Sequence, residues 1–247
     1  MTQTERQNEI LDLILREKCS NVKELSAAVY ASPATIRRDL HTLENRGLVR
    51  LQYGNVIPLS EKPRELPLAF RQNQAKKSKQ RIAQFAANMI PPNASVLLDA
   101  SSSALYLADY LQPDFNITVF TNCLKTVIKL CEKNISVYCI GGKIDNKNFV
   151  TSGSWTEDNV NSIHVDYLFF SSKAIDDNGL ISGDSESGIR MRRLMIEHSS
   201  KQYFLCDAEK KGRKSTFSLC NASEITGVIT DGDFSEIPDI NTIRAVP

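Results

Sequence analysis

The sequence predicts an α/β protein with two domains, a small N-terminal winged helix-turn-helix and a larger Rossmann-like domain built on a mostly parallel sheet. Three observations lead to this prediction. Helical periodicity over the first 58 residues ends in two short β-rich runs. From about residue 75, short apolar runs alternate with helical segments, as in parallel sheets covered on both faces. The 247 residues also exceed what one compact core usually needs.

The N-terminal region is expected to hold three helices and a β-hairpin. The first helix should run from residue 4 to about residue 16, and the second should be capped by Asn21, with Glu24 in its first turn. After the third helix, residues 48–51 and 55–58 have the pattern of two strands joined by a tight turn. A helix-turn-helix followed by such a hairpin is a winged helix.

The third helix, residues 32–47, has both ends and both faces marked in the sequence. Ser32 is a suitable N-cap, Pro33 fits the first helical position, and Gly47 can take the left-handed conformation that ends a helix. One face carries the apolar residues Ile36, Leu40 and Leu43, and the opposite face carries Ala34, Arg37, Arg38 and His41.

This polar face has two interpretations. It can be the solvated side of an ordinary amphipathic helix, or it can contact DNA, with Arg37 and Arg38 sharing base-edge and phosphate contacts. In the second case Ser32 and Thr35 would donate to a phosphate at the helix N-terminus, and His41 would lie at the edge of the contact. Asp39 is predicted to be structural and to pair with a nearby cation.

Composition indicates a cytoplasmic protein without a structural metal. The net charge is +1, and residues 1–60 hold eight basic against seven acidic residues, so any DNA contact depends on placement of charge. No apolar run reaches membrane-spanning length, and no signal peptide is recognised. The six cysteines form no C-x-x-C pair and are expected to be buried free thiols.

Residues 59–77 are predicted to be a basic linker between a winged helix at 1–58 and a larger domain at 78–247. Residues 61–81 hold seven basic residues against two acidic ones, and Pro58, Pro63 and Pro67 interrupt regular structure. The basic run would add sequence-independent affinity for DNA, or it is simply the solvated start of a helix.

Six short β-rich runs predict the parallel strands of the larger domain, at 95–99, 117–120, 135–140, 167–170, 203–206 and 227–230. Helices are expected near 78–90, 103–111, 122–132 and 186–199. Ligands of such sheets bind beyond the carboxyl ends of the strands.

Polar residues gather where these strands end. Hydroxyl and N–H groups at a helix N-terminus, completed by a lysine from a neighbouring loop, could hold a phosphate, although serines at one such place can simply cap a helix. The residues concerned are Asp99, Ser101, Ser102, Ser103, Asn122, Gly141, Gly142, Lys143, Ser171, Asp207 and Lys210.

The chain resembles the DeoR-type bacterial transcriptional regulators over essentially its full length. The most specific part is the sequence Thr-Ile-Arg-Arg-Asp-Leu at 35–40 with its flanks at 32–50. Further likeness lies in the Asp-x-Ser-Ser-Ser loop at 99–103, Thr-Asn at 121–122, Gly-Gly at 141–142, Glu186 at the start of a late helix and Asp-x-x-Lys at 207–210. The resemblance implies a C-terminal sugar-phosphate sensor related in fold to ribose-5-phosphate isomerase.

The chain departs from the family pattern at several places. In the wing, Tyr53 stands where the family usually has glycine, and we expect Tyr53 to reach a phosphate or sugar of the DNA instead. Arg50 is also expected to contact DNA. In the sensor, Ser101, Ser171 and Ala174 replace glycines, and Glu209 adds a negative charge beside the pocket. These departures bear on which ligand the sensor accepts.

The function implied is that of a repressor of sugar-metabolism genes that binds operator DNA as a homodimer or homotetramer and is released by a phosphorylated sugar. No cofactor is expected. A ligand-dependent activator would use the same sites. An isomerase-like enzyme is a further alternative, for which the carboxylates and lysines Asp99, Lys143, Glu186, Asp207 and Lys210 could supply acid–base groups.

Overall fold

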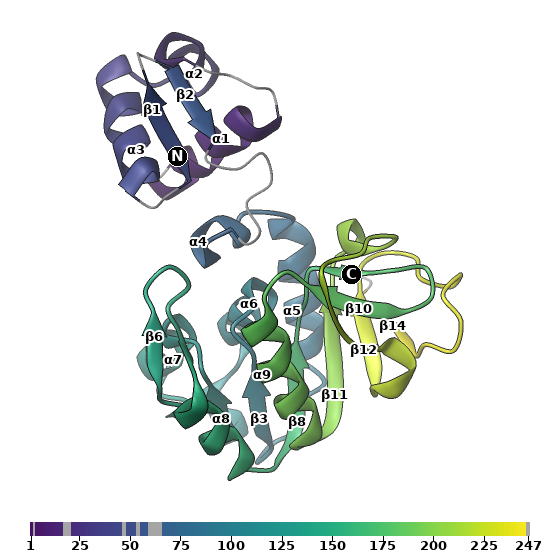
Figure 1. Ribbon diagram of the computed structural model, residues 1–247. Helices are drawn as coiled ribbons and strands as arrows, with labels where there is room; N and C mark the ends of the chain where they lie inside the picture. The colour runs from purple at the N-terminus through teal and green to yellow at the C-terminus, as the bar shows by residue number, and fades with distance from the viewer. Residues whose placement is uncertain (2, 17–20, 46–47, 53–54, 59–65, 246–247) are drawn as a thin grey trace. The chain divides into compact units, whose positions relative to one another are not determined.

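The computed structural model describes residues 1, 3–16, 21–45, 48–52, 55–58 and 66–245 (Figure 1). These residues form two compact units, Met1–Asn73 and Gln74–Pro247, which are described separately. Cys19, Gly47, Tyr53, Gly54 and residues 59–65 of the predicted linker lie outside the described residues.

The first unit is a winged helix, as the sequence predicts. Its helix-turn-helix and its antiparallel hairpin lie where the periodicity and the turn signals indicate, and a further short helix follows them. The elements are α1 (Gln3–Arg16), α2 (Val22–Ala28), α3 (Pro33–Asn45), β1 (Val49–Gln52), β2 (Asn55–Pro58) and α4 (Leu68–Arg71).

One apolar core holds this unit together. It joins the inner faces of α1, α2 and α3 to the hairpin, and Phe70 of α4 belongs to the same core although residue 70 falls within the predicted linker. Ile36, Leu40 and Leu43 are completely buried, which confirms the apolar face predicted for the third helix. The side chain of Asn21 caps α2 by accepting the N–H of Glu24 at 2.9 Å, also as predicted.

Asp39 is a buried charge that ties α3 to α1. Its carboxylate accepts hydrogen bonds from Nε of Arg6 at 2.6 Å and from Nε2 of Gln7 at 3.0 Å, and its side chain is 1% exposed. Gln3 adds a longer contact at 3.4 Å. The predicted structural role of Asp39 is therefore confirmed, and Arg6 is its cation.

We expect Asp39→Ala to destabilise the winged helix by about 3 kcal/mol, because it removes the buried counter-ion that Arg6 contacts at 2.6 Å and the acceptor of the 3.0 Å hydrogen bond from Gln7. Hydrogen exchange on the full chain, read peptide by peptide, should show faster exchange in α1 and α3 and unchanged exchange in the second unit. Unchanged protection of α1 and α3 would contradict this role for Asp39.

The second unit is built on a seven-stranded sheet that is parallel throughout, with the strand order β14-β13-β11-β8-β3-β4-β5. Six of the strands match the predicted runs within a few residues. The strands are β3 (Ser95–Leu98), β4 (Thr118–Thr121), β5 (Ser136–Cys139), β8 (Val165–Phe170), β11 (Ser199–Cys206), β13 (Gly227–Thr230) and β14 (Thr242–Arg244).

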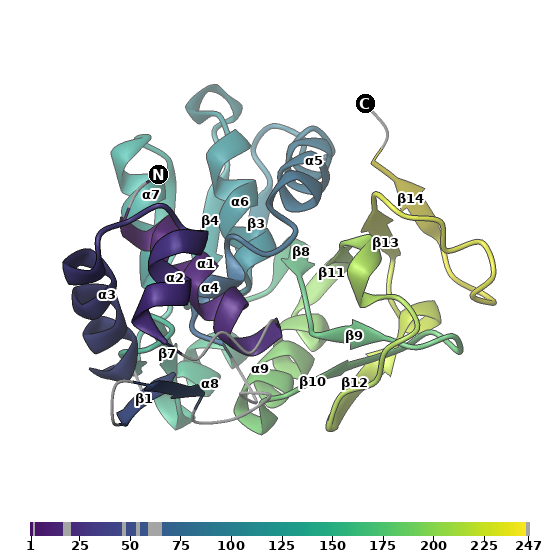
Figure 2. The same cartoon turned by 90° about the horizontal axis from the view of Figure 1, so that it is seen from above.

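Helices cover both faces of this sheet (Figures 1 and 2). Alternate residues of the central strands enter different cores, so that Leu98 lies in the core formed with α5, α6 and α7, and Leu97 in the core formed with α8 and α9. The helices are α5 (Lys76–Ala87), α6 (Ser102–Tyr110), α7 (Leu124–Glu132), α8 (Ser154–Asn161) and α9 (Glu186–Glu197). The predicted class, a Rossmann-like α/β domain, is confirmed.

The smaller elements of this unit are not predicted from the sequence. Besides α8 and β14, they include an antiparallel hairpin that follows β5 in the chain and an antiparallel sheet of order β12-β10-β9. Their strands are β6 (Lys143–Asp145), β7 (Val150–Ser152), β9 (Ala174–Ile175), β10 (Leu180–Gly183) and β12 (Phe217–Asn221), and short 3₁₀ turns occupy Pro113–Phe115, Ala208–Lys210 and Ala222–Glu224.

The expectation that all cysteines are buried is wrong for two of them. Cys131 on α7 and Cys139 on β5 are exposed, because β5 is an edge strand and Cys131 lies on the outer side of its helix. Cys123 and Cys206 are buried free thiols, and Cys220 is half-buried. Within the described ranges, no helix has both the length and the apolar character that crossing a membrane would require.

Candidate nucleic-acid interface and anion site

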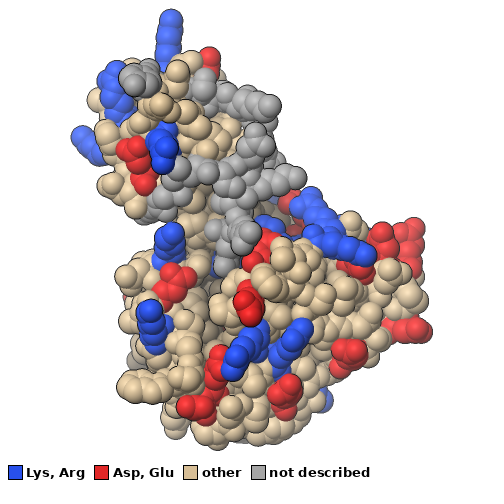
Figure 3. Space-filling view, in the orientation of Figure 1, with Lys and Arg blue, Asp and Glu red and all other residues tan. Residues whose placement is uncertain are grey.

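The outward face of α3 carries the residues predicted to contact DNA. Ser32, Ala34, Arg37 and Arg38 are exposed, and Thr35 is half-buried. Because the apolar side of α3 is fully buried, these side chains are held outward on a fixed helix. The charged surface of this unit is drawn in Figure 3.

The start of α3 is arranged by two hydroxyl groups. Oγ of Ser32 accepts the N–H of Thr35 at 3.2 Å and lies 2.9 Å from its Oγ1. Ser32 is thus the N-cap that the sequence predicts. At the other end, His41 is exposed and lies 3.6 Å from the carboxylate of Glu44, which also accepts the N–H of Leu51 in the wing.

Two exposed residues on this surface, Lys23 and Tyr30, were not predicted from the sequence. A groove between α2 and α3 is lined by Lys23 and Arg37 together with small and apolar side chains. Tyr30, in the turn between the helices, is 97% exposed and has a φ of +51°. The position of Tyr30 in the predicted turn between the two helices is the sequence signal that could have identified it. In the wing, Arg50 is exposed, whereas Tyr53 lies outside the described residues.

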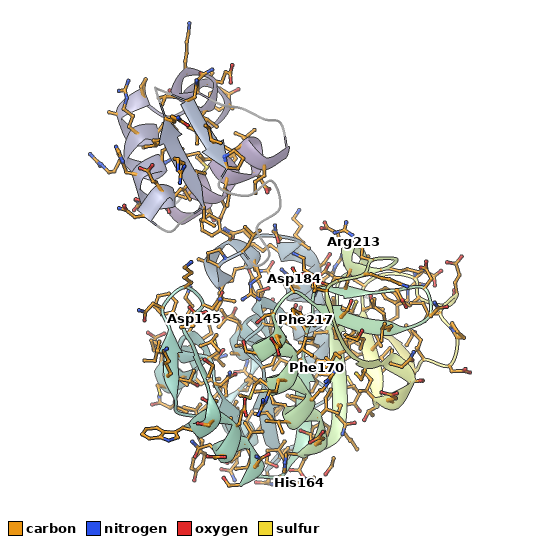
Figure 4. The ribbon with its side chains drawn as sticks, in the orientation of Figure 1. Asp145, His164, Phe170, Asp184, Arg213 and Phe217 are labelled. Carbon is orange, nitrogen blue, oxygen red and sulfur yellow. The ribbon has the colours of Figure 1, made fainter. Side chains whose placement is uncertain are left out.

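In the second unit, the predicted polar residues lie at the carboxyl edge of the sheet. The strand order reverses between β3 and β8, since β4 and β5 follow on one side and β11, β13 and β14 on the other. Such a switch point is where parallel sheets bind ligands. Figure 4 labels His164, just before β8, and Phe170, the last residue of β8. The line from His164 to Phe170 therefore points toward the carboxyl edge of the sheet.

Asp99 follows β3 and connects the two halves of the sheet. Its carboxylate accepts the N–H of Ser101 at 3.1 Å, the N–H of Ser171 at 3.3 Å and Nε of Arg192 at 2.8 Å. The side chain of Asp99 is 2% exposed and that of Arg192 is 16% exposed. Asp99 therefore orients the loops after β3 and β8, and Arg192, on α9, is a site residue that the sequence analysis missed.

Three buried serines open helix α6. Oγ of Ser101 accepts the N–H of Ala104 at 3.1 Å, so this serine is the N-cap of α6, as the simpler interpretation proposed. Ser102 and Ser103 are 5% and 2% exposed, and no hydrogen bond to their hydroxyl groups is found among the described residues. The N–H groups of these first two helical residues have no partner within the helix, which makes them donors for an anion.

Lys210 lies beside the same loops. Its Nζ donates to Oγ of Ser171 at 2.7 Å and contacts Oδ2 of Asp207 at 3.1 Å. Oγ of Ser171 in turn donates to the carbonyl of Leu205 at 2.6 Å. The side chain of Lys210 is 15% exposed, so a cation is held close to the switch point with limited access to water.

Asp207 is ionised in this arrangement. Burial by itself raises the pKa of Asp207, but the charge and hydrogen bond of Lys210 and the charge of Lys79 outweigh it and hold the pKa below its ordinary value. Lys79, on α5, is only 4% exposed, although both interpretations of the basic run at 61–81 place its lysines in solvent.

Asn122, which follows β4, and Gly141 and Gly142, which follow β5, form a second group at the carboxyl edge of the sheet. Nδ2 of Asn122 donates to the carbonyl of Thr151 at 3.0 Å, whereas its Oδ1 is buried without a partner among the described residues. Gly142 has a φ of +147°, and a Cβ placed there would lie 2.0 Å from Oγ1 of Thr156. Gly141 has no such neighbour.

Lys143 and Glu186 make no hydrogen bond or ion pair with Asp99, Ser171, Asp207 or Lys210 in the described part of the chain. Lys143 lies on β6 and Glu186 begins α9, and both are exposed. Asp99, Ser171, Asp207 and Lys210 are joined by the hydrogen bonds given above. In the described part of the chain, no group of three His, Cys, Asp or Glu side chains could hold a metal ion.

Comparison with known proteins identifies relatives of both units. A family model described as the DeoR C-terminal sensor domain matches residues 74–232, and one described as the DeoR-like helix-turn-helix domain matches residues 6–62. The L-fucose operon activator of Haemophilus influenzae is 33% identical over 90% of this chain and 89% of its own length. The transcriptional repressor AccR of Agrobacterium fabrum is 33% identical over 91% of this chain and 88% of its own.

Among solved structures, ribose 5-phosphate isomerase A from Methanocaldococcus jannaschii is similar, with a TM-score of 0.42 and 10% identity over 55% of this chain and 54% of the isomerase chain.

Proposed function

Because this chain belongs to the DeoR family of transcriptional regulators, we propose that it represses sugar-metabolism genes and is released from its operator by a phosphorylated sugar. The observation that carries the proposal is the arrangement of α3, the second helix of the helix-turn-helix. Its apolar face is completely buried, and Arg37 and Arg38 are exposed on the opposite face.

DNA recognition is assigned to the exposed face of α3 and to the wing. A guanidinium directed at a base edge can bind O6 and N7 of guanine together, and one directed sideways neutralises a phosphate, so Arg37 and Arg38 divide these roles. Ser32 and Thr35 are assigned to phosphate, and Ala34, His41, Arg50 and Tyr53 complete the proposed set. Lys23 and Tyr30 join it on the basis of their exposure.

The effector is assigned to the switch point of the second unit. The N–H and hydroxyl groups of Ser102 and Ser103 would hold the phosphate at the start of α6, with Lys210 as the nearby cation. Asn122, whose Oδ1 has no hydrogen-bond partner among the described residues, and the loop of Gly141 and Gly142 would face the sugar. Lys143 and Glu186 remain candidates at the rim of this site.

The sign of regulation is proposed to be repression, as in the name of the Agrobacterium relative; the Haemophilus relative is named an activator. Operator affinity with and without effector distinguishes the two. We further propose a cytoplasmic homodimer or homotetramer, since paired half-sites on DNA require a symmetric reader. Equilibrium sedimentation of the full chain measures this directly.

We propose that the chain is not an isomerase. Asp99 and Asp207 are the carboxylates nearest to the site, and they are ion-paired with Arg192 and Lys210. A paired carboxylate whose pKa is lowered, as for Asp207, is a weak general base near neutral pH. Turnover of ribose 5-phosphate or of another pentose or hexose phosphate by the purified protein would overturn this assignment.

A thermal-shift panel tests the effector site. The probes are inorganic phosphate, ribose 5-phosphate, fructose 1-phosphate, fructose 6-phosphate, glucose 6-phosphate and glycerol 3-phosphate. A probe present at 100 times its Kd stabilises the folded state by about 2.7 kcal/mol, which raises Tm by roughly 5 °C or more. We expect Ser102→Ala and Lys210→Ala to abolish this rise while operator binding persists.

The matched control is Lys147→Ala, which removes an exposed lysine of the β6–β7 turn and should leave the shift unchanged. A shift that persists in both Ser102→Ala and Lys210→Ala would place the phosphate elsewhere.

A further inference from the structure

Exposed apolar side chains of the second unit gather at one end of its sheet. Among the described residues of this unit, every large exposed apolar side chain except that of Phe115 belongs to α7, β5, the β6–β7 hairpin or α8. The hairpin, α7 and α8 lie on the same side of the unit, away from β14 (Figures 1 and 2). We call this surface the β5 face. Its members are Ile128, Tyr138, Ile144, Phe149 and Trp155, which are exposed by 60%, 60%, 49%, 45% and 77%.

Contacts within the unit hold the elements of the β5 face together. The ring of Tyr138 stacks on that of Phe120 in β4, with the ring centroids 4.8 Å apart. The carbonyl of Phe149 accepts the N–H of Leu124 at 2.9 Å, which fixes the hairpin to the start of α7. Helix α7 packs against β5, and α8 packs against β7. The face is therefore a surface of packed elements.

The area of the β5 face is close to what a stable dimer buries. Since a whole large side chain presents about 200 Å², its five members expose on the order of 600 Å². The largest apolar patch on a typical monomer is about 300–600 Å², and a standard interface buries about 800 Å² on each partner. The face is thus at the upper limit for a monomer, and the backbone of β5 adds to it.

Strand β5 presents unpaired backbone groups beside these side chains. It ends the sheet, and only β4 pairs with it in the described part of the chain. The N–H of Ile140 bonds to the carbonyl of Thr121 at 2.9 Å, and successive residues of a strand direct their backbone groups to opposite sides, so Val137 and Cys139 direct theirs outward. Charges, prolines and bulges usually protect an edge strand, and β5 has none of them.

The lysines of α7 are engaged within the unit. Nζ of Lys129 contacts the carboxylate of Asp109 on α6 at 2.6 Å, and Nζ of Lys133 donates to the carbonyls of Asp109 and Leu111 at 2.7 and 2.6 Å. Nζ of Lys125 lies 5.2 Å from the ring centroid of Phe149.

The exposed charges around the β5 face are balanced. Among residues 124–161, the exposed charged residues are Glu132, Lys143, Asp145, Lys147 and Asp158. Neither sign dominates, so two identical copies of this surface do not repel each other, and a strongly acidic or strongly basic partner finds no complementary field.

On these observations we propose that the β5 face is a dimer interface, and that its occupant is a second copy of this chain whose β5 pairs antiparallel with the first. A two-fold axis at β5 offers each outward N–H a carbonyl of the same strand in the partner, so the surface is complementary to itself. The inference rests on the proposed function only in the need for a symmetric reader of paired half-sites. The interface itself requires neither DNA nor effector.

Sedimentation equilibrium of the full chain over a range of concentrations tests the interface. Tyr138→Lys and Trp155→Lys each place two like charges at the two-fold axis, and each should raise the dimer dissociation constant at least about 10-fold. Phe115→Lys changes an exposed aromatic residue outside the β5 face and should associate as the parent does. A tetrameric parent should fall to dimers in the same two variants.

Two outcomes of sedimentation would overturn the proposal. One is unchanged association of both folded variants. The other is a monomeric parent, which would assign the face to another occupant, such as the first unit of the same chain or a different protein.

Hydrogen exchange and cross-linking locate the contact on β5. Exchange of residues 136–139 should slow as the concentration of the parent rises, and should not do so in Trp155→Lys. When Cys19, Cys131 and Cys220 are replaced by serine, Cys139 is the one remaining thiol that is not buried. A short bismaleimide should then join two chains, and the further change Cys139→Ser should remove this product. A dimer that gives neither signal has its interface elsewhere, which contradicts the proposal.

Far-UV circular dichroism shows whether Tyr138→Lys is folded, since this change also removes the stack on Phe120. If it is unfolded, Trp155→Lys decides, because its side chain is the most exposed of the face. Operator binding by the Arg37 and Arg38 variants tests the proposed function independently. A monomeric parent that still binds operator through α3 would overturn the interface alone.

Discussion

Replacing both Arg37 and Arg38 by alanine should lower operator affinity at least 30-fold. Each guanidinium that binds a guanine edge contributes roughly 1–3 kcal/mol, and one that binds a phosphate adds a salt-dependent share. Both side chains are exposed on a helix whose other face is buried, so their loss should not disturb the fold. Fluorescence anisotropy with DNA from upstream of the neighbouring operon measures the change.

The single variants distinguish the two roles. Loss of a phosphate contact should weaken binding to all sequences alike and reduce the salt slope by about one, whereas loss of a base contact should relax preference at one base pair. Arg213→Ala, which removes an exposed arginine from the second unit, is the matched control and should bind as the parent does. If the double variant bound the operator as tightly as the parent, α3 would not be the recognition helix.

Replacing Gly142 by alanine should destabilise the second unit by about 3 kcal/mol or more. The φ of +147° is strained for any residue with a Cβ, at about 1–3 kcal/mol. The added carbon would also lie 2.0 Å from Oγ1 of Thr156 and 3.0 Å from the carbonyl of Ser152, so the loop or α8 must move. Urea unfolding of the full chain, followed by far-UV circular dichroism, measures the loss.

Gly141→Ala is the matched control, because a Cβ at Gly141 meets no atom within 4 Å. Adding Thr156→Ala to Gly142→Ala removes the nearest clashing atom, so the double variant should be more stable than the sum of the single effects indicates. Additive effects would show that the clash with Thr156 does not contribute, and wild-type stability of Gly142→Ala would refute the backbone argument itself.

The parts of the fold with strong local signals could be predicted from the sequence. The caps Asn21 and Ser32 and the period of Ile36, Leu40 and Leu43 define their helices with little help from the rest of the chain. Asp39 could be assigned a structural role because an acidic residue among apolar neighbours needs a cation, although its partner Arg6 lies 33 positions away.

Other features depend on contacts that sequence order does not reveal. The run at 135–140 has the composition of a buried strand, but β5 ends the sheet, and so Cys139 is exposed. Arg192 is a charged residue on an amphipathic helix, and only the arrival of Asp99 from a distant strand makes it a site residue. The three-residue and two-residue strands β6 and β9 are too short to show any period.

The reversal of strand order between β3 and β8 also has a consequence for folding kinetics. Helix α6, β4, α7, β5, the β6–β7 hairpin and α8 all lie between β3 and β8 along the chain, so the pairing of β8 with β3 at the centre of the sheet closes a long loop. Closing so long a loop is slow, because its entropy is lost before the pairing is gained. Asp99 and Ser171 lie on the two sides of this junction. If the junction forms late in folding, a ligand held across it should act chiefly by slowing the separation of the two halves, which lengthens the lifetime of the folded sensor.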